Sequence, residues 1–135
     1  SNGDVIRLAP KGPQQVGNER TGRLVLDGDT IIASDGDTIT QRRRLSWYGI
    51  INVAVALDGD NNLLGDPVIR LHGIPIEAEI DDFLDEANAA AEKAVRDWRG
   101  DLSVLRENLR LFVRRFFTSL SGKKPIVDVL IVETA

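Results

Sequence analysis

The chain has 135 residues, of which 42% are hydrophobic and 28% are charged, and its formal net charge is −4. This length and apolar content suffice for one buried core, while the negative charge argues against a protein whose whole surface binds nucleic acid, although local basic patches remain compatible with it. Cysteine is absent, which excludes disulfide bonds and thiolate chemistry, and no apolar run approaches the roughly 20 residues that span a bilayer, so we expect a soluble, cytoplasmic protein without membrane contact.

The first forty residues alternate short apolar runs with turn residues such as Pro10–Pro13, Asp27–Asp29 and Asp35–Asp37. This alternation predicts a short β meander over residues 1–40. The meander has few large side chains, so we expect it to need another domain to pack on. Residues 41–46, which contain three consecutive arginines, are predicted to form a basic linker to a second domain at residues 47–135.

Three strands are predicted in the second domain. Tyr48–Leu57 and Leu63–Leu71 flank a turn at Asp58–Asn62, and the segment that begins at His72 ends the second strand. Ile126–Val132 is an almost continuous β-branched run, which favours a central position in the sheet over an edge.

Two amphipathic helices are predicted between the second and third strands. Glu79–Trp98 keeps apolar residues at helical spacing over five turns, and Leu102–Leu120 does the same. The second helix should bury one face, formed by Leu102, Leu105, Leu109, Phe112, Val113, Phe116 and Leu120. Asp101 can cap its first turn, Gly122 suits a left-handed stop, and Pro125 prevents continuation.

The order β-β-α-α-β predicts an α+β fold. Two antiparallel helices, each with one apolar face, need a sheet to cover, so we expect a two-layer sandwich in which they cover a three-stranded sheet. The last strand is expected to insert beside the first strand of this domain.

Acidic residues and the single histidine are the candidate metal ligands. Three Asp-Gly-Asp triplets, at Asp27, Asp35 and Asp58, resemble calcium ligands, but tight turns require the same residue types. His72 has no second histidine and no cysteine to complete a zinc site. We therefore expect turns and a structural or exposed histidine, and no catalytic or metal-binding residue in this chain.

Basic side chains are the remaining candidates for binding. They form one cluster before the second domain and a stripe on the last helix, which could follow RNA phosphates, and a solvated, salt-bridged face is the alternative. The RNA-binding candidates are Arg42, Arg43, Arg44, Arg106, Arg110, Arg114, Lys123 and Lys124. Leu111 and Phe117 are the candidates for an interface with another copy.

Several segments together resemble one known family. They are Asn2–Leu8, Gly22–Val25 with Asp27-Gly28, Arg42–Leu45 before Gly49, Leu71–Pro75, and Gly122–Pro125 before the last strand. Their order and spacing resemble the C-terminal part of bacterial ribonuclease J. Methionine is also absent, so no residue here could start translation, and we expect a piece of a larger protein.

The resemblance implies a parent enzyme with a metallo-β-lactamase fold, an inserted β-CASP domain, and two zinc ions, or manganese in some members. It implies 5′-to-3′ exonuclease and endonuclease action on RNA, with every metal-binding motif upstream of this chain. By resemblance, residues 1–40 are the tail of the catalytic domain, and residues 47–135 are the domain used in assembly. We thus expect a non-catalytic domain that forms homo-oligomers and holds no cofactor of its own. An RNA-binding accessory module is the alternative.

Overall fold

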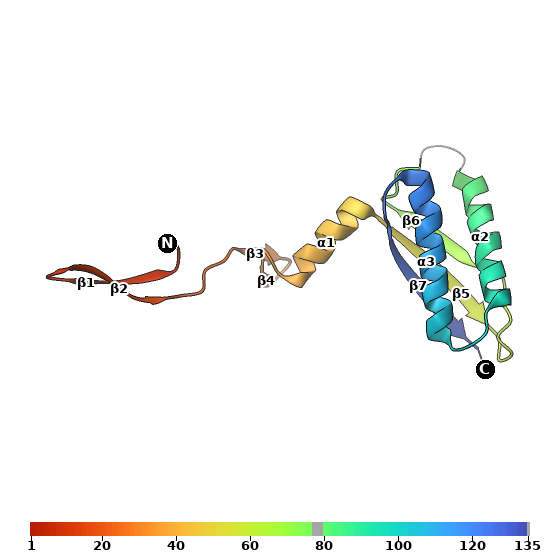
Figure 1. The fold of residues 1–135 in the computed structure, drawn as a ribbon, viewed down its shortest axis with the longest axis horizontal. Coiled ribbons are helices and arrows are strands. Elements are labelled where there is room, and N and C mark those ends of the chain that lie inside the picture. The colour runs from red at the N-terminus through yellow and green to blue at the C-terminus, as the bar shows by residue number, and fades with distance from the viewer. Residues whose placement is uncertain (77–79, 135) are drawn as a thin grey trace. The chain divides into compact units, whose positions relative to one another are not determined.

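The computed structural model describes residues 1–76 and 80–134. The chain divides into two compact units, Ser1–Arg42 and Arg43–Ala135. Helix α1 (Asp37–Tyr48) crosses this boundary. Figure 1 labels all the helices and strands.

The first unit contains two separate β hairpins. Strands β1 (Asp4–Ala9) and β2 (Gly12–Asn18) form one, and β3 (Leu24–Asp27) and β4 (Thr30–Ala33) form the other. Antiparallel β structure is thus confirmed at the start of the chain, as two two-stranded sheets in place of one continuous meander.

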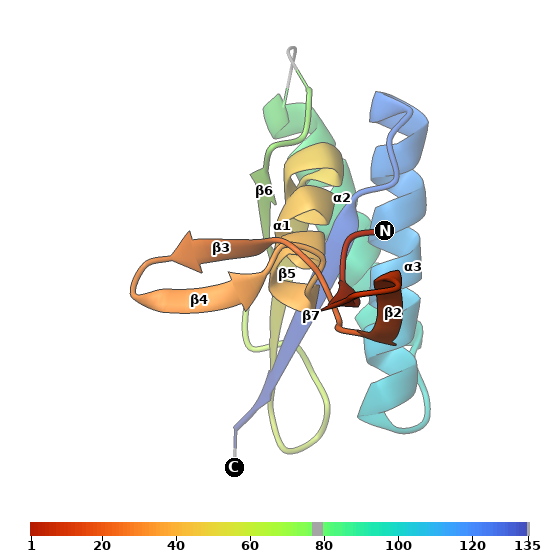
Figure 2. The ribbon, with the colours of Figure 1, turned by 90° about the vertical axis from the view of Figure 1, so that its left-hand side faces the viewer.

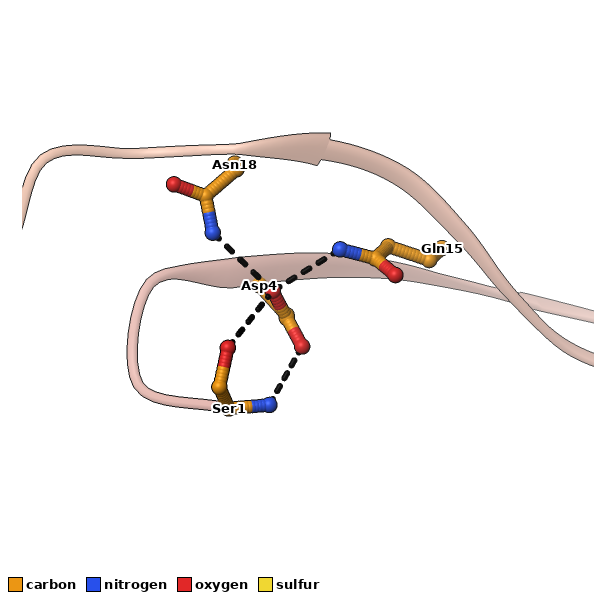
Figure 3. A network of polar contacts seen from close by, with 4 residues as sticks. All are labelled: Ser1, Asp4, Gln15 and Asn18. Carbon is orange, nitrogen blue, oxygen red and sulfur yellow. Dashed lines mark hydrogen bonds and ion pairs between the residues drawn. The ribbon is translucent and has the colours of Figure 1, made fainter.

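A carboxylate holds the open end of the first hairpin together. Asp4 accepts hydrogen bonds from Gln15 Nε2 at 2.8 Å, from Asn18 Nδ2 at 2.9 Å and from Ser1 Oγ at 3.1 Å, and it also pairs with the terminal amino group (Figure 3). The amino group and then Asn18 are the main causes that lower the pKa of Asp4.

The basic linker predicted at residues 41–46 lies within α1. Asp37 places a negative charge in the first turn of this helix, which favours a helical start. No residue of α1 is buried, so the helix has no apolar face that periodicity could reveal. Thr38–Thr40, which fall within the predicted meander, are helical as well.

The second unit is built on a mixed sheet with the order β6-β5-β7. Strand β5 (Ile50–Leu57) lies in the centre, pairs antiparallel with β6 (Val68–His72) and parallel with β7 (Ile126–Glu133). The expected insertion of the last strand beside the first is confirmed. The expected central position of Ile126–Val132 is wrong, because β7 is an edge strand.

The two predicted strands before the helices are shorter than expected. Tyr48 ends α1, and Gly49 connects it to β5. The second strand begins only at Val68, after the Gly65-Asp66-Pro67 segment, because proline has no N–H to donate to the hydrogen bonds between strands. Leu63 makes only an isolated bridge to Leu57.

Helices α2 (Ile80–Asp97) and α3 (Leu102–Ser121) run antiparallel and form the second layer (Figures 1 and 2). Helix α2 contacts β6, and α3 contacts β7. The two-layer β-β-α-α-β sandwich is therefore confirmed. Glu79, the predicted first residue of α2, lies outside the described residues.

The core lies between these helices and one face of the sheet. Its buried members are Ile51, Val53, Val55, Leu57, Ile69, Ala87, Ala91, Val95, Trp98, Leu105, Leu109, Val113, Phe117 and Val129. Phe117 is fully buried, whereas Phe116 and Phe112 are only half-buried at the margin of the core. The predicted stripe on α3 was thus wrong at its end, because the buried positions follow a four-residue step that leads from Val113 to Phe117 and leaves Leu120 exposed.

Both predicted ends of α3 are confirmed. The Asp101 carboxylate accepts hydrogen bonds from the backbone N–H groups of Ser103 and Val104. Gly122 adopts a left-handed conformation with φ 69° and donates its N–H to the Thr118 carbonyl. Free amides and carbonyls at the two ends are therefore partly satisfied within the chain.

Candidate functional site

The helices leave the second face of the sheet uncovered. Successive side chains of a strand point to opposite faces, so the residues that alternate with the core positions form this open face. They are Val68, Arg70, His72, Ile50, Asn52, Ala54, Ala56, Ile126, Asp128, Leu130 and Val132. Leu130 is 60% exposed, Val68 is 48% exposed and Val132 is 45% exposed. Three exposed aliphatic side chains on one sheet face are an apolar patch of the kind found at interfaces.

One row of the open face is charged. The strand registers place Asn52 of β5 opposite Arg70 of β6 on one side and opposite Asp128 of β7 on the other. The next row consists of Val68, Ala54 and Leu130. The open face therefore combines a positive edge, a negative edge and an apolar row within one small surface.

A second feature is a basic hollow of about 260 Å³ in the second unit. It is lined by Arg44, Tyr48, Arg110, Arg114, Lys124, Ile126 and Val127. The Ile126 N–H donates to the Gly49 carbonyl at 3.2 Å, and this bond fixes the start of β7 beside the end of α1. Residues far apart in the sequence thus meet in one hollow.

Four of the eight predicted RNA-binding residues line this hollow, namely Arg44, Arg110, Arg114 and Lys124. Lys123 lies outside it, with Nζ 5.4 Å from the centre of the Trp47 ring and 3.3 Å from the Trp47 carbonyl oxygen. Arg42 belongs to the first unit and pairs with Asp27 at 2.8 Å. Arg43 and Arg106 are exposed and do not line the hollow.

One of the four cations is already neutralised. Arg110 donates from Nε and from Nη2 to the two carboxylate oxygens of Glu107, each at 2.7 Å. These hydrogen bonds lower the pKa of Glu107 and raise the pKa of Arg110. Within residues 1–76 and 80–134, Arg44, Arg114 and Lys124 take part in no ion pair. The hollow therefore carries uncompensated positive charge.

The two predicted interface residues fail to form a surface together. Phe117 is fully buried in the core, so its prediction as an interface residue is wrong. Leu111 is half-buried on α3. Neighbouring residues of a helix point about 100° apart, so Phe117 points into the core while the adjacent Phe116 lies at its margin.

Sequence reasoning missed Tyr48 in the hollow and the Arg70, Asn52 and Asp128 row on the open face. The sequence pattern places Tyr48 in the strand predicted over Tyr48–Leu57, whereas the residue ends α1. Asp128 interrupts an apolar run in β7, and this interruption was the available signal that one face of the strand is not covered.

A larger hollow of about 580 Å³ lies between the Asp60–Leu63 segment and the end of α2. Its charged side chains are of both signs, and they include Asp60, Glu92 and Arg96. Arg99 donates to the carbonyls of Arg96 and Trp98, so its guanidinium is partly occupied. The lining of this hollow is mixed in charge and therefore does not indicate one class of ligand.

Two of the three acidic triplets form turns, and the third leads into α1, which begins at Asp37. Gly28 and Asp29 make the turn between β3 and β4, and Asp58 accepts hydrogen bonds from the N–H groups of Asp60 and Asn62. The N–H and amide groups of Asn62 lower the pKa of Asp58 most.

His72 is exposed at the end of β6. In the part of the chain that the structure describes, no three His, Asp or Glu side chains gather as a metal site would require. No described helix is both long and apolar enough to cross a membrane.

Comparison with known proteins identifies the family. The family model described as "Ribonuclease J C-terminal domain" matches residues 37–134. The chain belongs to this family. It is also 38% identical over 138 residues to ribonuclease J of Sinorhizobium meliloti, and the alignment covers 98% of this chain. The chain spans about a quarter of that relative, because the match covers 24% of the relative's length. The ribonuclease J domain match includes α1 and residues 43–134 of the second unit.

Proposed function

We propose that this chain is the non-catalytic assembly domain of a cytoplasmic, ribonuclease J-like enzyme of RNA processing and decay, and that the open face of its sheet binds a second copy. In this proposal the hydrolytic activity, 5′-to-3′ exonucleolytic and endonucleolytic, belongs to the rest of the enzyme. Zinc or manganese would be bound there as well, by residues other than those described here.

The single observation that carries the proposal is the composition of the open face. A sheet normally buries both faces or makes one of them polar. Here the open face has Leu130, Val132 and Val68 exposed beside a charged row. Burial of this apolar area against another copy would contribute about 25 cal/mol for each Å² removed from water.

The charges favour a second copy over an unrelated partner. A two-fold axis parallel to β5, midway between two open faces, would place β6 of one copy over β7 of the other. Arg70 of each copy would then face Asp128 of the other, because both residues are in register with Asn52. Such a self-complementary surface is what a two-fold symmetric interface requires.

The apolar part of this interface can be tested by sedimentation velocity on the full chain. We expect a dimer for the unaltered chain and a monomer for the double variant Leu130→Lys/Val132→Lys. A matched control, Val104→Lys/Leu120→Lys, adds the same charge at similarly exposed positions of α3 and should remain dimeric. A monomeric unaltered chain at tens of micromolar, or equal dissociation of both variants, would contradict the proposal.

The hairpins of the first unit need their own control. Leu26 and Ile31 are 74% and 67% exposed, and such residues can associate nonspecifically. The variant Leu26→Lys/Ile31→Lys should retain the dimer if the sheet face is the interface. Loss of the dimer in this variant alone would assign the association to the hairpins instead.

A further inference from the structure

The basic hollow points to a second binding activity, beyond the proposed assembly. We propose that the hollow lined by Arg44, Arg110, Arg114 and Lys124 binds a backbone phosphate of single-stranded RNA, with Tyr48 positioned to stack on a neighbouring base. None of these five residues belongs to the open face of the sheet.

The charge of the hollow is the first argument. Its lining contains four cations and no carboxylate, in a chain whose net charge is −4. Glu107, which lies outside the lining, neutralises the charge of Arg110. Arg44, Arg114 and Lys124 have no such ion-pair partner among the described residues. Like charges gathered in one hollow repel each other, and a bound anion relieves this repulsion.

The positioning of the cations is the second argument. Arg114 is half-buried on α3, and Arg110 is held in a fixed geometry by its two hydrogen bonds to Glu107. Arg44 comes from α1, and Lys124 from the loop before β7. A guanidinium group can bind phosphate oxygens through two parallel hydrogen bonds. Among the described residues Arg44 and Arg114 keep these donors for a phosphate, whereas Arg110 already uses Nε and Nη2 on Glu107 and adds only its remaining N–H groups.

The volume of the hollow and the presence of Tyr48 in its lining limit the kind of ligand that it can bind. A hollow of about 260 Å³ is smaller than the roughly 300–1,000 Å³ typical of cofactor pockets, and it suits one phosphate with its sugar. Tyr48 lines the same hollow and is 37% exposed, which leaves part of its ring accessible. Cations beside an accessible aromatic ring are the pattern of sites for single-stranded nucleic acid, in which bases stack on aromatic side chains.

The proposal can be tested by fluorescence anisotropy with the full chain and a labelled oligouridylate at several salt concentrations. The double variant Arg114→Gln/Lys124→Gln should bind roughly tenfold more weakly at low salt, because the loss of one phosphate contact lowers the slope of log affinity against log salt by about 0.7. The matched control Arg106→Gln/Arg115→Gln removes the same charge from exposed positions outside the hollow and should leave this slope unchanged. Equal losses in the two variants, or no binding by the unaltered chain at low salt, would overturn the proposal.

A second measurement locates the bound phosphate. In NMR spectra of the unaltered chain, the oligouridylate should shift the Nε–H signals of Arg44 and Arg114 and leave those of Arg106 and Arg115 in place. Inorganic phosphate should reproduce only a small part of these shifts. If inorganic phosphate reproduced all of them while the oligouridylate produced none, the site would take a free phosphate ion and the RNA proposal would be wrong. Sedimentation of the same variants separates the two proposals, since Arg114→Gln/Lys124→Gln should remain dimeric whether or not it binds RNA.

Discussion

At the scale of single residues, Gly49 carries a constraint that no other residue type meets. It ends α1 with φ 69°, and a Cβ atom there would lie 2.6 Å from the Gly73 carbonyl oxygen and 2.7 Å from Ile74 Cδ1. Gly49→Ala should therefore destabilise the second unit by more than the roughly 1–2 kcal/mol that a left-handed conformation costs an ordinary residue. Urea unfolding would measure this. Gly122→Ala is the matched control, because Gly122 has the same φ but open space around its Cα, and it should cost less. Equal costs would contradict the predicted clash.

Asp101 predicts a dependence of stability on pH. Hydrogen bonds from the Ser103 side chain, and then from the N–H groups of Ser103 and Val104, lower the pKa of the Asp101 carboxyl group in the folded protein. The folded state thus binds this proton more weakly than the unfolded state does. The resulting stabilisation is complete above the unfolded pKa of about 4 and is lost as the pH falls through the lower folded pKa.

Urea unfolding of the unaltered chain and of Asp101→Asn between neutral and acid pH tests this dependence. Asparagine keeps an oxygen that can cap the helix but cannot titrate. The stability advantage of the unaltered chain should shrink as the pH falls below about 4. An advantage that stayed constant over this range would show that the Asp101 charge contributes nothing.

At the scale of elements, α3 anchors the core through Phe117. Phe117→Ala should lower the free energy of unfolding by about 3–5 kcal/mol, the usual cost of removing a fully buried phenylalanine. Phe116→Ala should cost less, because Phe116 is only half-buried and packs edge-on against Phe117 and beside Phe112. Urea unfolding of both variants would compare them, and a larger loss for Phe116→Ala would contradict the assignment of the core.

The helices and strands also show which parts of the fold can be predicted from the sequence alone. The spacing of apolar residues predicted both long helices of the second unit, and Asp101 and Gly122 marked the ends of α3, because local chemistry decides these features. Helix α1 was missed because it buries no residue and so carries no apolar period. The expected central position of β7 was wrong, although its neighbour was predicted correctly, because a β-branched run does not reveal whether both of its faces and both of its edges are covered.

The candidate site was predictable only in part. The arginines and lysines were recognised as candidates, but not which of them meet. Arg44 and Lys124 share a hollow because the Ile126 N–H bonds to the Gly49 carbonyl, and this contact depends on where β7 enters the sheet. The Arg70, Asn52 and Asp128 row likewise exists only once the register of all three strands is known.

At the scale of the whole molecule, the chain matches the C-terminal domain of ribonuclease J, and its described residues contain no cluster of metal ligands. The role that we propose for it is assembly. The central claim is that the open faces of two copies meet with Arg70 of each facing Asp128 of the other. This arrangement predicts that Arg70→Glu and Asp128→Arg each place like charges opposite each other in a dimer of identical copies. Each variant alone should then dissociate.

Mixing these two variants is the most direct test, because opposite charges would meet again in a dimer that contains one copy of each. The glutamate introduced in one copy would face the arginine introduced in the other, and the remaining Asp128 would face the remaining Arg70. Sedimentation velocity on each variant alone should give monomers, and on the equimolar mixture it should give this mixed dimer. If both variants remained dimeric alone, or if the mixture stayed monomeric, the open face of the sheet would not be the interface.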